Sequence, residues 1–149
     1  MINLKKANNR LQFLCQNIPD LLYNIPEQEF CYKPVSDKWS KKEILGHLID
    51  SAANNHQRFI RVQFENVPDI TYDQNNWNKY SHHNSIDAEH LILFWKLYNQ
   101  HLLQLIKHIP QKSLDRECKI GEMNNVTLHQ LVEDYVVHLE HHLHQLTKY

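Results

Sequence analysis

Length, composition and charge set the first limits on this chain of 149 residues, of which 42% are hydrophobic and 22% are charged. These are ordinary globular values, and the length suits a single domain, 1–149, with a sizeable core. A net charge of −1 without a basic run excludes the electrostatic footprint of a nucleic-acid-binding protein. Because no apolar run approaches membrane-spanning length, we also expect no membrane partner.

The cysteines and the first residues of the sequence indicate a compartment. Cys15, Cys31 and Cys118 are odd in number and widely spaced, which is typical of reduced thiols that pack in a core. The first ten residues lack the apolar core of a signal peptide. We therefore expect a cytoplasmic protein.

The first half of the chain contains two predicted helices. The first covers residues 3–17, where Pro19 ends or kinks it, although the apolar residues that follow could continue it. The second begins at the capping box formed by Ser40 and Glu43 and continues to about residue 65.

The second half contains two more predicted helices. One begins near Asn84 or Ser85 and is stopped by Pro110, and the other begins at the capping box formed by Thr127 and Gln130. Long loops separate the second helix from the third and the third from the fourth, and residues 110–126 have room for a short extended excursion. With only two glycines, a hairpin-rich β fold is disfavoured. The pattern predicts an all-α four-helix bundle.

The last helix carries the main chemical signal, the pair His138 and His142. Residues four apart lie one above the other on a helix, so two imidazoles at this spacing can hold one metal ion. With 12 histidines in the chain, about one such pair is expected by chance. Periodicity places the pair at one edge of the apolar stripe and turns His129 and His144 away. Two half-buried histidines with ordinary hydrogen bonds are the competing interpretation.

A third ligand has to come from another segment. The second helix presents a polar stripe at helical spacing beside its apolar face, and this stripe could equally be a solvated flank: Glu43, His47, Ser51, Asn54 and Arg58. Periodicity does not prefer His47 over His56, so the residues alone leave the third ligand open.

The segment from Pro34 to Asp50, PVSDKWSKKEILGHLID, resembles the signature of the DinB/YfiT-like superfamily. It combines a Trp-Ser helix start with Gly-His-Leu-x-x-Asp, followed downstream by an asparagine and an arginine. The spacing His138-x-x-x-His142 is similar to the second motif of that family. Tyr72-Asp-Gln together with Trp77 resembles the YfiT branch.

This resemblance implies a four-helix bundle, often dimeric, that binds a divalent metal through His47, His138 and His142. It also implies metal-dependent hydrolysis, or chemistry that depends on a low-molecular-weight thiol. Three imidazoles leave metal positions open, as catalytic sites do. Zinc or nickel suits such ligands best, but imidazole also accepts iron and cobalt. A bound ion would lower the pKa of a coordinated water or thiol, so the same ligands suit hydrolysis and thiol transfer.

Four further residues are candidates for supporting roles. Asp50 and Asp134 could each accept the free N–H of a ligand imidazole, although both could be plain surface carboxylates. Arg58 could clamp a substrate carboxylate or form a surface salt bridge. Gln74, with Trp77, could line the mouth of the site. Trp39 is expected in the core at the helix start.

We therefore expect a metal-dependent enzyme that acts on a small molecule, and the resemblance favours thiol S-transfer over simple hydrolysis. A non-catalytic metal-binding or dimer-forming helical protein is the alternative. The two differ in the coordination sphere, since an enzyme needs an exchangeable position and a pocket. A homodimer is expected in either case.

Overall fold

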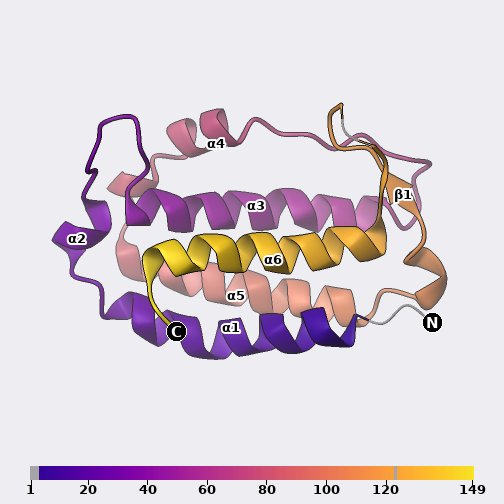
Figure 1. Cartoon of the computed structure of the whole chain (residues 1–149), viewed down its shortest axis with the longest axis horizontal. Coiled ribbons are helices and arrows are strands. Elements are labelled where there is room, and N and C mark those ends of the chain that lie inside the picture. Colours follow the sequence, from indigo (N-terminus) through magenta and orange to yellow (C-terminus); the bar gives the residue numbers. More distant parts are fainter. Residues whose placement is uncertain (1–3, 123) are drawn as a thin grey trace.

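Four long helices form the body of the protein and pack side by side (Figure 1). The computed structural model describes residues 4–122 and 124–149. The bundle helices are α1 (Lys5–Tyr23), α3 (Lys41–Arg61), α5 (Ala88–Lys107) and α6 (Leu128–Leu146). The predicted all-α four-helix bundle is therefore confirmed. Within the described ranges, no helix has the length and apolar character needed to cross a membrane.

Each bundle helix turns an apolar face toward one shared core. Fully burying a leucine or phenylalanine side chain contributes about 1.5–3 kcal/mol, so these faces hold the bundle together. The most deeply buried members include Leu11, Leu14 and Ile18 of α1, Leu45, Leu48 and Phe59 of α3, Trp95 and Leu102 of α5, and Leu139 and Leu143 of α6.

The helices α3 and α5 run parallel, whereas α1 and α6 run in the opposite direction (Figure 1). The contacts along the parallel pair agree with this arrangement. Ser40 Oγ donates to Asn84 Oδ1 at 2.6 Å where the two helices start, and His56 Nδ1 lies 3.0 Å from the Tyr98 hydroxyl further along. A parallel pair cannot be joined by a short turn, so the chain has to return along the bundle between residues 62 and 87.

The return segment is more structured than the long loop that the sequence predicts. It contains α4 (Gln74–Ser81) and a 3₁₀ turn, η1 (His83–Ser85). It is fastened to α3 by Asn78, whose side-chain amide donates to the Glu43 carbonyl at 2.8 Å. The crossover, as we name residues 62–87, therefore covers one side of α3 with defined contacts.

The helix ends follow local capping chemistry. The predicted capping boxes at Ser40 and Thr127 are both formed. The third bundle helix begins later than predicted because the side chain of Asp87 accepts a hydrogen bond from the backbone N–H of His90 at 3.0 Å. The first helix continues through Pro19, because the turn beyond it carries an apolar residue that is fully buried in the core, Leu22.

Three smaller elements complete the described chain. The expected extended excursion is confirmed as an antiparallel pair, β1 (Glu117–Cys118) and β2 (Val126–Thr127). The short helices α2 (Glu27–Cys31) and η2 (Gln111–Ser113) were not predicted, since five and three residues are too few to show a helical period.

Candidate metal centre

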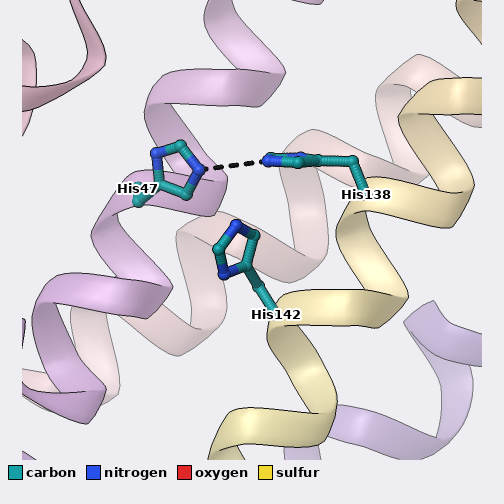
Figure 2. A group of neighbouring side chains, drawn as sticks. All are labelled: His47, His138 and His142. Carbon is teal, nitrogen blue, oxygen red and sulfur yellow. Dashed lines mark hydrogen bonds between the residues drawn. The ribbon is translucent and has the colours of Figure 1, made fainter.

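Three histidines from two helices meet on one side of the bundle (Figure 2). His47 comes from α3, and His138 and His142 come from α6. Their ligand nitrogens all lie within 4.8 Å of one another, and His47 Nε2 is 3.2 Å from His138 Nε2. The side chain of His47 is buried, and the other two are half-buried. The structure thus brings together the three predicted ligands.

The structure also shows which histidine of α3, His47 or His56, supplies the third ligand position. His56 faces α5, where its ring contacts Tyr98 and His101 at centroid distances of 5.6 and 5.3 Å. His47 faces α6, and its ring lies 5.1 Å from that of His138. The choice that periodicity left open therefore depends on which helix packs beside which face of α3.

The nitrogen separations fit a metal ion. Two nitrogens bound to one tetrahedral Zn²⁺ at about 2.0–2.1 Å lie roughly 3.3 Å apart. The 3.2 Å between His47 Nε2 and His138 Nε2 matches that separation. A nitrogen of His142 points toward the space between the other two rings (Figure 2). Three imidazoles arranged in this way suit a divalent ion with open positions.

The protein keeps these imidazoles neutral, which is the form that binds metal. Burial, together with the charges that His138 and His142 would carry, lowers the pKa of His47 to about 3. Burial and the neighbouring His142 and His141 lower the pKa of His138 to about 4. Burial also lowers the pKa of His142. At neutral pH each ring therefore has a lone pair on one of its two nitrogens, which is the form that binds a metal ion.

The lowered pKa values predict a loss of stability in mild acid. Between pH 6.5 and 5, we expect the metal-free protein to lose about 1.5 kcal/mol of unfolding free energy for each of His47 and His138. Both folded-state pKa values lie below 6.5, the ordinary pKa of histidine, so the unfolded chain binds more protons in this window. The contribution is complete above pH 6.5 and declines toward the folded values, about 3 and 4.

Urea unfolding of the metal-free protein at several pH values measures this effect. The double variant His47→Gln/His138→Gln is the control, because it keeps polar side chains but removes both titrations. Its stability should depend less steeply on pH than that of the parent chain. Equal slopes for the two proteins would contradict the prediction.

Asp50 makes a different hydrogen bond from the one considered in the sequence. Its Oδ2 lies 3.1 Å from Nε2 of His83, and both side chains are buried. The ring of His83 lies directly over Gly46, where an added Cβ would be 2.1 Å from its Cγ. Within the described residues, Nδ1 of His47 is buried without a hydrogen-bond partner. The structure therefore shows no hydrogen bond between His47 and Asp50, and a supporting role of Asp50 toward a bound metal stays a prediction.

On α6, the contact to a ligand histidine is made by an amide. Oε1 of Gln145 lies 3.3 Å from Nδ1 of His142, and Nε2 of Gln145 lies 3.4 Å from Nε2 of His141. A proton on Nδ1 of His142 leaves its Nε2 free for a metal ion. Asp134 is exposed on the same helix, and its support of a ligand stays a prediction.

The polar stripe of α3 is not a solvated flank, and that interpretation is wrong. Of its five members, Glu43 is half-buried and the other four are buried: His47, Ser51, Asn54 and Arg58. Asn54 satisfies its side-chain amide locally by donating to the carbonyl of Asp50 at 2.9 Å.

Arg58 fastens the crossover to α3. Its Nε and Nη2 donate to the carbonyl of Ile70 at 3.1 and 2.8 Å, so the surface salt bridge that the sequence also allowed is not formed. Eleven residues of helix, roughly 16 Å, separate it from His47 along the axis. Gln74 is exposed at the start of α4. Substrate binding by Arg58 or Gln74 stays a prediction.

Trp39 corrects a further expectation, because it is half-buried and lies beside the site instead of in the core. Its ring centroid is 4.9 Å from that of His47 at an interplanar angle of 36°. It also lines a cavity of about 520 Å³ together with Gln145 and Asn75. Sequence reasoning missed Gln145, although its spacing of three from His142 on one helix was a usable signal.

Comparison with known proteins places the chain in a family. A family model described as the DinB superfamily matches residues 10–146. Among solved structures, YfiT from Bacillus subtilis is similar with a TM-score of 0.83 and 18% identity, over 98% of this chain and 86% of that one. YfiT is described as a probable metal-dependent hydrolase with an unusual four-helix bundle topology.

Two further structures share the fold. A mycothiol-dependent maleylpyruvate isomerase has a TM-score of 0.79 and 11% identity, over 97% of this chain and 60% of that one. The DinB-like protein YjoA from Bacillus subtilis has a TM-score of 0.66 and 17% identity, over 95% and 87%. A search of curated proteins gives no match. Because the family model spans nearly the whole sequence, this chain belongs to the DinB superfamily.

Proposed function

We propose that the protein is a metal-dependent enzyme that acts on a small molecule, with transfer of a low-molecular-weight thiol as its reaction. The observation that carries this proposal is the cluster of His47, His138 and His142, whose nitrogens converge within 4.8 Å. Three protein ligands leave coordination positions open, whereas structural zinc sites use four. The open positions favour an enzyme over the non-catalytic alternative.

The residues of the chain prepare the site for this reaction. Burial keeps the rings of His47 and His138 neutral, so they accept an ion without first losing protons. The Trp39 ring packs beside the buried His47 ring at a centroid distance of 4.9 Å. A divalent ion held here would lower the pKa of a coordinated thiol and so supply a nucleophile at neutral pH.

The structural neighbours support our proposal that a thiol, and not water, is the nucleophile. One structural neighbour is a mycothiol-dependent isomerase, and another is described as a probable hydrolase. Both share the fold at low identity, so the preference for thiol transfer is our proposal for this chain. Zinc or nickel is the ion that we propose.

A paired assay tests the reaction type. The metal-loaded protein is incubated with a panel of small electrophiles and esters, with and without an added thiol such as cysteine. We expect turnover that needs both the metal and the thiol, because the thiol is the nucleophile. Turnover that needs the metal but not the thiol would replace this proposal by a hydrolase. No turnover, combined with a metal whose remaining ligands do not exchange, would favour the non-catalytic protein.

We also propose a homodimer, and the outer face of α5 offers a surface for it. Leu93, Phe94 and Leu97 are between 44% and 52% exposed there. Apolar side chains gathered on one exposed face are typical of association surfaces. Sedimentation at micromolar concentration distinguishes a dimer from a monomer.

A further inference from the structure

A cavity of about 520 Å³ opens at the end of the bundle where α3 begins and α6 ends. Its size falls in the range of about 300–1,000 Å³ that small-molecule sites occupy. Its wall combines apolar, amide and charged side chains from four segments of the chain: Asp37, Lys38, Trp39, Ile44, Asn75 and Gln145.

Two of these residues connect the cavity to the metal ligands. Trp39 lies against the ring of His47 at a centroid distance of 4.9 Å, and Gln145 contacts Nδ1 of His142 at 3.3 Å. Both residues therefore belong to the cavity wall and to the surroundings of the three histidines. The three histidines do not line the cavity themselves, so Trp39 and Gln145 are the residues that join it to the metal centre.

The two charged residues of the cavity wall, Asp37 and Lys38, differ from the lysines near them in the sequence because they form no ion pair with any residue that the structure describes. Neighbouring lysines are all paired with glutamates: Lys33 with Glu43, Lys41 with Glu29, and Lys42 with Glu27. Within the described residues, by contrast, the side chains of Asp37 and Lys38 form no ion pair, not even with each other. One free carboxylate and one free ammonium group therefore lie at the wall of a cavity.

We propose that this cavity is the substrate site of the metal centre and that it binds a zwitterionic small molecule of the amino-acid type. Lys38 receives the carboxylate of the ligand, and Asp37 receives its ammonium group. Trp39 and Ile44 contact its carbon chain, and the amides of Asn75 and Gln145 complement its polar groups. This inference rests on the proposed function, since the reacting group of the ligand has to reach the metal.

Small thiols and the cobalt-loaded protein test the inference without any need for turnover. Binding of a thiolate to Co²⁺ is followed by the sulfur-to-cobalt absorption band, and the d–d bands report that the cobalt stays bound. Four thiols distinguish the contribution of the carboxylate from that of the ammonium group. Cysteine carries both groups, 3-mercaptopropionate carries only the carboxylate, cysteamine carries only the ammonium group, and 2-mercaptoethanol carries neither. We expect each charged group to strengthen binding about threefold to fivefold, the upper value of an exposed ion pair.

Two substitutions assign these preferences to residues. Lys38→Gln should reduce the preference for 3-mercaptopropionate over 2-mercaptoethanol relative to the parent, and Asp37→Asn should reduce the preference for cysteamine over 2-mercaptoethanol. Chelation of the metal by the carboxylate or the amine of a probe is the same in the parent and the variant, so it cancels when the two preferences are compared. Lys112→Gln and Asp115→Asn, which change exposed residues outside the cavity, should leave all four constants unchanged.

The outcomes separate the two proposals. If cobalt stays bound but neither Lys38→Gln nor Asp37→Asn alters the preferences, the cavity inference is wrong and the metal site stands. If the four probes bind equally to the parent protein, the zwitterionic ligand is also excluded. If the protein binds no stoichiometric cobalt, the proposed function fails, and the inference fails with it.

Discussion

Replacing His142 by alanine is expected to abolish stoichiometric metal binding while the helical content stays unchanged. The ring supplies one of the three nitrogens that converge on the site within the described residues. Loss of a contact behind a ligand typically lowers metal affinity about 10- to 100-fold, and loss of a ligand itself should exceed this. The side chain is half-buried near the end of α6, so its removal leaves the core intact. Metal analysis after dialysis, together with circular dichroism, measures both quantities.

His144→Ala is the matched control for this experiment. His144 lies on the same helix two positions further along, is exposed, and stacks on Tyr149 at a centroid distance of 4.5 Å. Its replacement should leave the metal content at the level of the parent chain. Full metal content in the His142 variant, or equal losses in both variants, would overturn the assignment of the site.

Replacing Gly46 by alanine should have the largest effect on stability. The new methyl group would lie 2.1 Å from Cγ of His83, so the ring has to move. Movement of the ring breaks the buried contact between His83 and Asp50. Overpacking of a core typically costs 1–3 kcal/mol, and the disrupted pair adds to it, so we expect a loss of about 3 kcal/mol. The midpoint of thermal unfolding should fall by roughly 6–12 °C.

The variant His83→Ala provides the control, because it removes the ring that the methyl group would strike. His83→Ala is itself destabilising, since it leaves Asp50 buried without this partner. In that background, however, Gly46→Ala should no longer cost stability and should raise the unfolding free energy by up to about 1 kcal/mol, because alanine is the better helix former inside α3. If Gly46→Ala costs as much with alanine at position 83 as with histidine, the clash is not its cause.

The bundle helices could be predicted because their signals are local. Ser40 with Glu43 and Thr127 with Gln130 form capping boxes within four residues, and the apolar stripes repeat at the helical period. The pair His138 and His142 was visible for the same reason. His47 could not be identified from periodicity, because its role depends on α6 being the neighbour of that face of α3. The resemblance to the family supplied that information.

The surroundings of the site could not be predicted because they depend on tertiary contacts. The spacing of Asp50 from His47 allows either support of a ligand imidazole or a plain surface carboxylate, and it does not predict that the crossover brings His83 within 3.1 Å of Asp50. Trp39 is expected in the core at the helix start, yet it packs on the His47 ring beside a cavity. Each of these contacts joins segments whose relative position no local pattern encodes.

The wide separation of the ligands along the chain has a consequence for biosynthesis. His47 precedes His138 by 91 positions, so the ribosome releases the first ligand long before the other two. A nascent chain that ends before α6 contains only one of the three ligand imidazoles, His47, and cannot retain the ion at this site. Metal uptake therefore becomes possible only when the last helix docks against α3. From then on, the ion acts as a removable cross-link between two distant segments and stabilises the folded state in proportion to the logarithm of its free concentration.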